Sequence, residues 1–436
     1  MRNLTIHLMC VLASSLLFSC KKESIEVGEK LQGKVIIIGA GAAGLYAANL
    51  LKDAGKEFLI LEAQDHYGGR LGELTDFADY PLDLGAQWLH GNNNLAYFFA
   101  ESGKHNHQED ESEISYYFND QITSAVPKNL DLFEGKYKPD ISYWDYAMKE
   151  GLGEEYRYII EGIAGDQGAA ATRLSVKYNY EEEKNWNSGD QDYKFAQSYF
   201  EVIKNAFAEQ VASKIRLNSI VTNIDYAGNQ VIVKTSSDST YYGEKVLVTV
   251  PISVLQDGDI NFRPALPAEK TKAFQQIGMD AGIKVFLKFS SKFYKANVIG
   301  GKTCAAYIDE SVGKKGTDHV LLAFVMGTQA EALSVLGSDD AIAGALLSEL
   351  DEMYQGAASN SFIAAHVQNW GTNPFIKGAY SYSKVGMNKD TRWQAAQPVA
   401  DKVYFAGEAM CLSGEHQTVQ GALLSAYQQV VALMGE

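Results

Sequence analysis

One stretch near the N-terminal end constrains the fold more than any other: KVIIIGAGAAGLYAANLLKDAGKEFLILEA, residues 34–63. Its continuous apolar run at 35–38 predicts a strand buried on both faces, as in a parallel sheet. An apolar periodicity over 45–52 predicts a helix, and a second apolar run at 58–61 predicts the next strand. This strand–helix–strand order predicts a Rossmann-like unit.

Three glycines between the first strand and the helix have the G-x-G-x-x-G spacing of dinucleotide-binding proteins. Gly39 permits a tight turn, Gly41 lets the backbone approach a pyrophosphate, and Gly44 lets the helix pack closely against the strand. The diphosphate would lie at the positively polarised N-terminus of the helix. Glu62 ends the second strand, where its carboxylate can accept hydrogen bonds from a ribose diol.

The next segment contains a glycine pair, Gly68–Gly69, followed by Arg70. Backbone amides of such a pair can approach phosphate, and the guanidinium offers paired donors to it. Here the chain resembles the glycine-doublet flavoproteins. The motif LDLGAQWLHG at 82–91 narrows the resemblance to the flavin amine oxidase family, which includes the monoamine and polyamine oxidases. The resemblance implies FAD as the cofactor, with residues 85–88 beside the isoalloxazine ring.

The C-terminal segment KVYFAGEAMCLSGEHQTVQGALLSAYQQVVALM resembles the closing motif of the same family. We expect a short strand at 403–405, and the resemblance implies that Glu408 holds the ribityl chain. From Val419 apolar residues recur at helical spacing to the end of the chain. The N-terminus of this helix would face the N1–C2=O edge of the flavin, where its dipole favours negative charge by about 1 kcal/mol.

The expected FAD contacts come from these motifs and from one residue in the middle of the chain. They are Gly39, Gly41, Ala43, Gly44, Glu62, Ala63, Gly69, Arg70, Leu71, Gly85, Ala86, Gln87, Trp88, Val221, Gly407, Glu408, Thr418 and Val419. Monoamine oxidases attach their flavin through a cysteine that comes just before a tyrosine of the substrate cage. Ala379 stands at that position, so we expect FAD to be bound non-covalently.

The expected fold class is α/β and α+β: a Rossmann-like, glycine-doublet FAD-binding domain with an interleaved substrate domain of mixed sheet and helices. The FAD-binding domain would be discontinuous and formed by residues 30–90, 214–264 and 400–436. The substrate-binding domain would comprise residues 91–213, which we expect to be largely helical, and 265–399, which we expect to form a sheet.

The octapeptide GIKVFLKF at 282–289 is expected to be a strand with a lysine inside an apolar run. Taken alone, its alternation puts Lys284 and Lys288 together on one face, which would ordinarily be solvated. In the amine oxidases a lysine on a substrate-domain strand holds a water against flavin N5, and alignment on this stretch selects Lys284. A buried ammonium needs a benefit because desolvation lowers its pKa. The benefit would be a hydrogen bond from Lys284 to that water, which would assist the reaction with oxygen or the hydrolysis of the imine.

Four further residues are candidates for the substrate site. The segment at 368–386 resembles the part of the family that lines the flavin, so Trp370 would pack near the ring and Tyr380 would form one wall of an aromatic cage. The second wall, a tyrosine in monoamine oxidases, falls on Thr418. A threonine there resembles the spermine and acetylpolyamine oxidases, as does His90. Plain aromatic packing for the first two residues and a loop hydrogen bond for His90 are the alternatives.

The resemblance implies an FAD-dependent oxidase of a small-molecule amine. Hydride would pass from the carbon next to nitrogen to flavin N5, water would hydrolyse the resulting imine, and O2 would be reduced to H2O2. An L-amino-acid oxidase or a carbon–carbon desaturase of the same fold stays open, with Arg157 or Arg173 as a carboxylate partner in the former. A non-catalytic, FAD-bound surface lipoprotein is the remaining alternative.

The first residues, MRNLTIHLMCVLASSLLFSC, resemble a bacterial lipoprotein signal. The apolar stretch at 8–18 is well short of the ~20 residues that a spanning helix needs. We therefore expect residues 1–19 to be a signal peptide, Cys20 to be lipidated as a membrane anchor, and residues 20–32 to be a tether to the cell envelope. An ordinary secretory signal is the alternative.

Composition argues against two other classes of function. The formal net charge of -16 disfavours nucleic-acid binding, where a basic surface is expected. The chain has 8 histidines and no CxxC or Cys/His spacing typical of a metal site. Two cysteines outside the expected signal, Cys304 and Cys411, could pair or remain free thiols.

Overall fold

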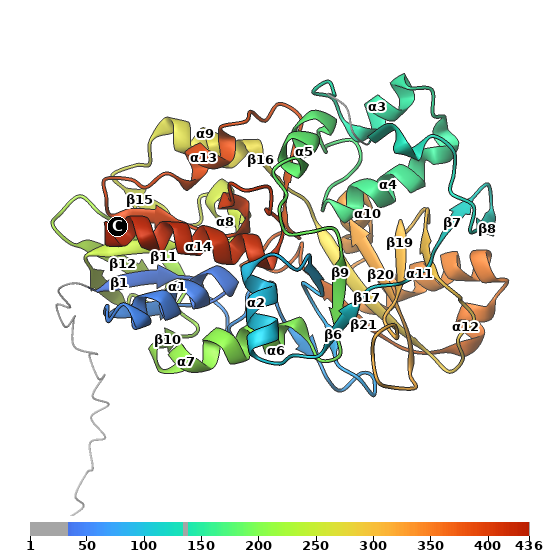
Figure 1. The fold of residues 1–436 in the computed structure, drawn as a ribbon, viewed down its shortest axis with the longest axis horizontal. Coiled ribbons are helices and arrows are strands. Elements are labelled where there is room, and N and C mark those ends of the chain that lie inside the picture. The colour runs from blue at the N-terminus through green and yellow to red at the C-terminus, as the bar shows by residue number, and fades with distance from the viewer. Residues whose placement is uncertain (1–33, 134–137, 436) are drawn as a thin grey trace, which may run out of the picture.

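The computed structural model describes residues 34–133 and 138–435 (Figure 1). The expected signal peptide at 1–19, the lipidated Cys20 and the tether at 20–32 lie outside the described residues. Within the described ranges, no helix combines the length and the apolar character needed to cross a bilayer.

A five-stranded parallel sheet, in the order β10–β2–β1–β14–β23, forms the centre of the first half of the molecule. Its strands are β1 (Val35–Ile38), β2 (Phe58–Leu61), β10 (Ile215–Arg216), β14 (Lys245–Val248) and β23 (Val403–Phe405). Both β1 and β2 are buried along their whole length, as their continuous apolar runs predict. The strands of this sheet therefore come from three separate segments of the chain.

The two faces of this sheet are covered by different elements. On one face, α1 (Ala42–Asp53) and α14 (Val419–Met434) lie side by side and bury alternate strand residues such as Ile37 and Ile60 (Figure 1). The other face packs against a four-stranded sheet in the order β13–β12–β11–β15. Its strands are β11 (Val221–Asp225), β12 (Val231–Thr235), β13 (Thr240–Gly243) and β15 (Asn261–Arg263).

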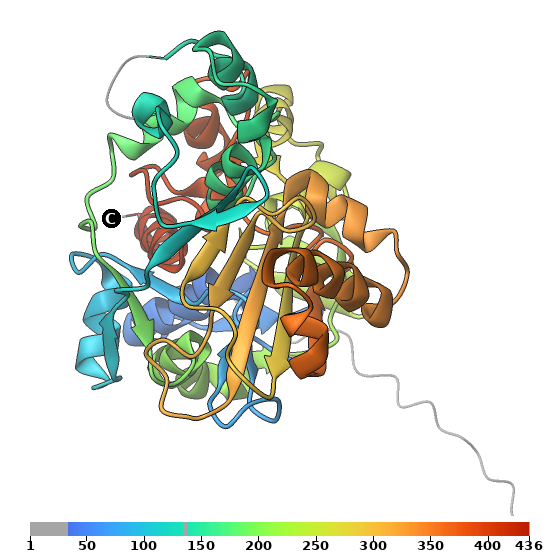
Figure 2. The same cartoon turned by 90° about the vertical axis from the view of Figure 1, so that its right-hand side faces the viewer.

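A seven-stranded mixed sheet forms the second half of the molecule, in the order β21–β17–β20–β19–β18–β7–β8. Its strands are β7 (Ile114–Phe118), β8 (Gln121–Thr123), β17 (Gly282–Phe289), β18 (Asn297–Ile299), β19 (Ala306–Asp309), β20 (His319–Met326) and β21 (Phe362–Asn369). One face packs under α11 (Asp339–Tyr354), which lies in front of the sheet in Figure 2. Because β17 alternates, Ile283 and Val285 point to that helix layer, and Phe286 packs in a separate cluster on the opposite face.

The remaining elements cap these sheets. Three helices form an upper layer beside the second sheet, α3 (Tyr143–Lys149), α4 (Arg157–Asp166) and α5 (Val176–Glu183). The other helices are α2 (Leu95–Ser102), α6 (Tyr199–Ile203), α7 (Glu209–Val211), α8 (Ile252–Asp257), α9 (Ala268–Gln276), α10 (Gly327–Ser334), α12 (Ala357–Ser361) and α13 (Thr391–Ala396). The short strands are β3 (Glu73–Leu74), β4 (Leu82–Asp83), β5 (Trp88–His90), β6 (His107–Glu109), β9 (Asp192–Phe195), β16 (Ile277–Met279) and β22 (Ser381–Ser383).

Two segments outside the predicted FAD-binding segments pack against the parallel sheet. Residues 195–211, expected in the substrate domain, bury Tyr199 and Phe207 in the same core as α1 and α14. Helices α9 and α13, also expected there, pack through Phe274 and neighbouring residues against the opposite face of the parallel sheet. The physical reason is that a parallel sheet must be covered on both faces, and the predicted FAD-binding segments supply too few helices for this.

Candidate active site

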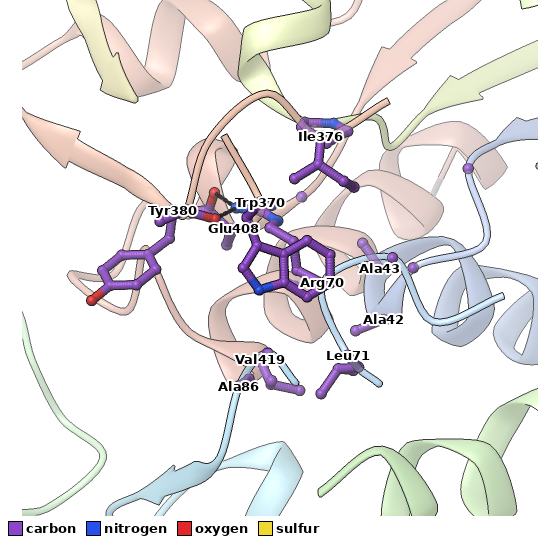
Figure 3. Close-up of a pocket in the computed structure, with 18 of the residues that line it drawn as sticks. Ala42, Ala43, Arg70, Leu71, Ala86, Trp370, Ile376, Tyr380, Glu408 and Val419 are labelled. Atoms are coloured by element: carbon purple, nitrogen blue, oxygen red, sulfur yellow. Dashed lines mark hydrogen bonds and ion pairs between the residues drawn. The ribbon is translucent and has the colours of Figure 1, made fainter. Parts of the chain in front are cut away.

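A cavity of about 820 Å³ is lined by residues of both halves of the molecule. The glycine-rich turn after β1, the end of β2 and the start of α14 line it from the first half. Lys284 of β17 and Met326 of β20 line it from the second half. Figure 3 shows Trp370 in the middle of the view, with Tyr380 to one side and Ala42 and Ala43 of α1 to the other.

The predicted site residues converge on this cavity with one exception. The lining includes Gly39, Gly41, Ala43, Glu62, Ala63, Gly69, Arg70, Leu71, Gly85, Ala86, Gln87, Trp88, His90, Val221, Lys284, Trp370, Tyr380, Gly407, Glu408, Thr418 and Val419. Gly44 lies behind the wall, where a Cβ atom would come within 2.0 Å of the Gly39 carbonyl oxygen. That contact is the close helix–strand packing for which the third glycine of the motif is needed.

Two glycine turns form the phosphate-facing end of the cavity. Gly39 has φ +103°, and the N–H of Gly68 donates to the carbonyl of Ala40 at 2.9 Å. A Cβ atom on Gly69 would lie 3.2 Å from the Cα of Gly41, so the two turns touch through backbone alone. The N-terminus of α1 has no side-chain cap, which leaves its N–H groups to a ligand. These features fit the diphosphate of a dinucleotide.

Glu62 is fixed by backbone donors at the same end. One carboxylate oxygen accepts the N–H of Ala40 at 2.6 Å, and the other accepts the N–H of Gln64 at 2.9 Å. Burial raises the pKa of Glu62 in spite of these two bonds. Each oxygen keeps a second lone pair, so the carboxylate remains able to accept from a ribose diol as predicted.

Arg70 makes contacts that the sequence did not predict. Its Nη1 donates to Glu408 Oε1 and to the carbonyl of Ala379, both at 2.9 Å, instead of extending toward the phosphate end (Figure 3). Ser381 Oγ also donates to Glu408, at 2.7 Å. Burial opposes ionisation of Glu408, but Arg70, Ser381 and Arg392 together lower its pKa to about 2. Glu408 is therefore ionised and paired with Arg70 on this wall of the cavity.

Lys284 is 2% exposed, so the solvated-face alternative is wrong. Its Nζ donates to the carbonyls of Asp83 at 2.6 Å and Gly85 at 3.0 Å, and to Oε1 of Gln87. Burial lowers the pKa of Lys284 to about 8, an effect that Glu310 and Asp83 partly oppose. The lysine thus fixes the 82–88 segment, which was expected to lie beside the isoalloxazine ring.

The two aromatic candidates are both held by backbone acceptors. Tyr380 donates from its hydroxyl to the carbonyl of Asp166 at 3.0 Å, and Trp370 donates from Nε1 to the carbonyl of Leu84 at 2.9 Å. A Cβ atom on Gly168 would lie 2.4 Å from the Tyr380 ring, so the glycine makes room for it. Each ring is therefore held in place where it lines the cavity.

Thr418 and His90 both have protein partners within the site. Thr418 is the N-cap of α14: its Oγ1 accepts the N–H of Gly421 at 3.0 Å and donates to the carbonyl of Glu415 at 2.7 Å. His90 Nδ1 lies 2.7 Å from Asp192 Oδ1. The loop hydrogen-bonding alternative for His90 therefore describes a contact that exists, and His90 still lines the cavity.

Sequence reasoning missed an acidic group in the cavity wall, formed by Asp166, Glu183 and Asp192. Asp166 and Glu183 are exposed to the open part of the cavity, yet loss of hydration against the surrounding wall raises the pKa of both carboxyl groups. For Asp166 the charge of His90 opposes this rise and the charge of Asp192 adds to it, and for Glu183 the charge of Asp166 adds to it. These three carboxylates come from α4, α5 and β9. The run EEE at 181–183 was the available signal, but most charge runs are solvated, so it did not stand out.

Three questions that the sequence left open concern the two arginines, the two cysteines and a metal site. Arg157 is paired with Glu161, and Arg173 with Asp280 and Glu331; neither arginine lines the cavity. Cys304 and Cys411 are buried free thiols, which answers the question that the sequence left open. In the described ranges no group of three His, Cys, Asp or Glu residues could hold a metal ion.

Two family models and several known proteins match this chain. Residues 128–434 match the family model for flavin containing amine oxidoreductases, and residues 37–102 match an NAD(P)-binding Rossmann-like domain. Lysine-specific histone demethylase 2 of Homo sapiens is 29% identical over 91% of this chain and 52% of its own length. Probable polyamine oxidase 4 of Arabidopsis thaliana is 28% identical over 92% of this chain and 87% of its own length. The chain thus spans about half the length of the demethylase.

Solved structures share the fold over nearly the whole chain. A wild-type putrescine oxidase bound to putrescine superposes with a TM-score of 0.78 at 20% identity, covering 93% of this chain and 100% of that one. Cyclohexylamine oxidase from Brevibacterium oxydans superposes with a TM-score of 0.77 at 19% identity, covering 92% and 98%. The expected Rossmann-like unit with a mixed second domain is confirmed. Since the family model covers more than half of the sequence, the chain belongs to the flavin containing amine oxidoreductases, enzymes that oxidise the carbon next to an amine nitrogen.

Proposed function

We propose that the protein is an FAD-dependent oxidase of aliphatic amines that carry a second positive charge, with O2 as the electron acceptor. The observation that carries this proposal is the acidic group of Asp166, Glu183 and Asp192, which lines the same cavity as Lys284 and Tyr380. Relatives named polyamine oxidase and putrescine oxidase support the same substrate class.

FAD, when bound, supplies a hydride acceptor that O2 can reoxidise. The two glycine turns and the N-terminus of α1 would hold its diphosphate, and Glu62 its ribose. Ala379 is 5% exposed and carries no nucleophile that could bond to the ring, so the cofactor would be bound non-covalently. Acid precipitation should then release the yellow cofactor into the supernatant. Flavin that stays with the precipitated chain would contradict this.

The cavity wall also suits the proton chemistry of an amine. An aliphatic ammonium has a pKa near ~10.4, so forming the neutral amine at pH 7 costs about 4 to 5 kcal/mol in water. The aromatic walls of Trp370 and Tyr380 disfavour the charged form at the reacting end and recover part of that cost. The carboxylates of the acidic group would instead stabilise a distal ammonium that remains charged.

Hydrogen peroxide release across a panel of diamines, polyamines, arylalkylamines and L-amino acids tests the substrate class. We expect peroxide with the diamines and polyamines and little with the others. Asp166→Asn should raise KM for a diamine about tenfold, roughly 1.4 kcal/mol, and leave KM for a monoamine unchanged. Asp238→Asn, which makes the same charge change in an exposed turn, is the matched control. Peroxide from amino acids alone would reject the proposal.

We further propose that the protein is exported and anchored in the cell envelope through a lipidated Cys20. The motif Leu17–Phe18–Ser19–Cys20 supports this proposal, because its small residue before cysteine is typical of bacterial lipoproteins. Metabolic labelling with a radioactive fatty acid should mark the wild-type protein and not Cys20→Ser. Equal labelling of both proteins, or of neither, would contradict the anchor.

A further inference from the structure

Glu310 is a buried carboxylate that lies behind the cavity wall and does not line the cavity itself. It is 3% exposed and follows directly on β19, where its N–H donates to the carbonyl of Val320 of β20 at 3.0 Å. Ile308, two positions earlier, packs in one cluster with Phe286 of β17. Strand alternation therefore directs Glu310 to the same face of the sheet as Lys284.

Gln87 connects this carboxylate to Lys284. Its Nε2 donates to Glu310 Oε1 at 2.9 Å, and its Oε1 accepts from Lys284 Nζ. An ammonium can only donate and an ionised carboxylate can only accept, so these two partners determine which end of the amide faces each of them. Gln87 is 4% exposed, and both Gln87 and Lys284 line the cavity. A buried chain of three side chains thus runs from Glu310 to the reactive end of the cavity.

The contacts of Lys284 fit an ammonium better than a neutral amine. Its acceptors are the carbonyls of Asp83 and Gly85 and the Oε1 atom of Gln87. An ammonium has three N–H donors, one for each acceptor, whereas a neutral amine has two. Loss of the proton would leave one of these acceptors without its donor, which is unfavourable in a buried site.

Glu310 is the strongest anionic influence on Lys284. Burial lowers the pKa of Lys284 to about 8, and of the charged groups that face it Glu310 opposes this fall most, with Asp83 second. Lys194 and Lys314 add to the fall. Asp83 is a weaker partner because burial raises its own pKa to about 7, and its Oδ2 atom lies 4.0 Å from Nζ of Lys314.

We propose that Glu310 is a positioning residue that, through Gln87, orients Lys284 and keeps its ammonium charged beside the reaction site, an inference that rests on the proposed oxidase activity. In the oxidative half of the reaction, two electrons and two protons pass from the reduced cofactor to O2, giving H2O2. Oxygen gains negative charge as it accepts electrons, and a fixed cation nearby stabilises that charge. Lys284 keeps its own proton throughout.

Stability measured against pH tests the link between the two charges without any turnover. Glu310→Gln keeps the size of the side chain and an acceptor for Gln87, and removes the charge. It should lower the folded pKa of Lys284 further below the unfolded value of 10.5. The resulting loss of stability is complete below both folded values and vanishes above them. The thermal midpoint of the holoenzyme should therefore fall more at about pH 6 than at about pH 9. Equal losses at both pH values would overturn the inference.

The same substitution in a Lys284→Met background isolates the pair. The difference between the losses at the two pH values should shrink there, because the ammonium is absent. The part that remains would come from Asp83, whose pKa Glu310 raises. Tyr80 and Tyr294 also face Glu310, but burial raises the pKa of both hydroxyl groups, so they stay neutral. A difference as large as in the wild-type background would overturn the inference.

Reoxidation of the reduced cofactor gives a second readout. The holoenzyme is reduced with stoichiometric dithionite and mixed with O2, and flavin absorbance is followed at each pH. In wild type the rate should fall as pH rises past about 8, where Lys284 loses its proton. In Glu310→Gln the same fall should occur about one pH unit lower. An unshifted profile would overturn the inference.

Three further variants make the result specific. Glu349→Gln removes another buried carboxylate, which accepts from Tyr307 at 2.7 Å on the opposite, helix-covered face of the same sheet, and it should leave the pH profile unchanged. A shift as large as that of Glu310→Gln would reject the role of Glu310. Glu310→Asp keeps the charge and should stay closer to the wild-type profile. If Glu310→Gln does not fold, Gln87→Met interrupts the chain and should slow reoxidation about tenfold at about pH 6, whereas a wild-type rate would reject the chain.

Failure of the proposed function can be told apart from failure of this inference. Unfolding and chemical reduction need no amine, so both readouts judge Glu310 whatever the substrate is. A wild-type enzyme that no amine reduces would reject the proposed function. A Glu310→Gln variant with the wild-type pH profile would reject only the role of Glu310.

Discussion

Lys284 and Lys270 are both buried, and burial lowers the pKa of both, but their ammonium groups have different neighbours. Lys284 has three acceptors at its ammonium group and carboxylates nearby, and its pKa falls to about 8. Lys270 is 4% exposed and donates to the carbonyl of Ala395 at 2.6 Å, and burial lowers its pKa to about 7. The first lysine lines the cavity and the second lies in the packing of α9 against α13, so only the first is expected to affect turnover.

Lys284→Met should keep FAD bound and slow oxidative turnover by at least about tenfold, or about 1.4 kcal/mol. The change removes the donor that holds the carbonyls of Asp83 and Gly85, as well as a cation beside the reaction site. Lys288→Met is the matched control, because Lys288 lies on the same strand and pairs with Asp318 outside the cavity. Steady-state peroxide assays compare the two variants. Similar rates for wild type and Lys284→Met would show that the lysine is structural.

Lys270 should make stability depend on pH. Its pKa is about 7 in the folded protein and 10.5 when unfolded, so between these values the unfolded state binds more protons. Stability then rises with pH across that window, by up to about 1.4 kcal/mol per pH unit. Lys270→Met should therefore be more stable than wild type at about pH 7, and its advantage should shrink at about pH 9. Thermal unfolding at both pH values checks this.

The control for Lys270 lies on the same helix. Lys272 is exposed, so Lys272→Met should give no pH-dependent difference from wild type. A Lys270→Met advantage that grew with pH would have the wrong sign and would show that the buried ammonium is stabilised by its carbonyl partners and by the Phe405 ring, 4.1 Å away.

At the scale of elements, α14 joins the sequence motif to the site through its first turn. Thr418 caps the helix, and a Cβ atom on Gly421 would come within 1.8 Å of the Glu415 carbonyl oxygen. The N-terminus of α14 is therefore packed tightly against the loop that carries His416 and Gln417. A cap at this position determines where the positive end of the helix points.

Thr418→Val should weaken the first turn of α14 by about 1 kcal/mol, because the N–H of Gly421 loses its acceptor. Hydrogen exchange of the holoenzyme should show the amides of that turn exchanging roughly fivefold faster. Thr418→Ser keeps the hydroxyl and should leave exchange unchanged. Unaltered exchange in the valine variant would mean that packing, and not the cap, fixes this turn.

Elements could be predicted from the sequence where their signal is local. The strands at 35–38, 58–61, 282–289 and 403–405 and the helix from Val419 are all present at or near their expected bounds. Each combines an apolar period with a turn residue within a few positions. The helical segment 199–211 packs in the core of α1 and α14, and the sequence could not predict this partner, because an apolar face does not reveal what will bury it.

The site could be predicted where a motif determines it and not where distant residues meet. The glycine turns and Lys284 follow from short motifs, and they line the cavity. The Arg70–Glu408 pair joins positions 338 apart in sequence, and its charge partners cannot be inferred from either motif. Asp166 and His416 were missed for the same reason, since each becomes a wall residue only when α4 and the loop before α14 meet.

At the scale of the whole molecule, the cavity is where the two halves share a ligand site. Its dinucleotide end is formed by the first half, around Glu62 and Val221. Its reactive end includes Lys284 and Tyr380 from the second half, and the Arg70–Glu408 pair joins the walls there. A ligand that fills the whole cavity contacts both halves, whereas one that fills only the dinucleotide end contacts the first.

Removing FAD should therefore lower the free energy of unfolding of both halves, and ADP, which corresponds to one end of the cofactor, should not restore the stability of the second half. Adding FAD at about 100 times its Kd should stabilise the apoprotein by about 2.7 kcal/mol. ADP at the same multiple of its own Kd should stabilise the first half by the same amount. The amides of the seven-stranded sheet should, however, exchange as fast with ADP as they do in the apoprotein. Hydrogen exchange resolved to β17 and β20 separates the two outcomes. Protection of these strands by ADP alone would show that the halves are coupled through their own packing and not through the shared ligand.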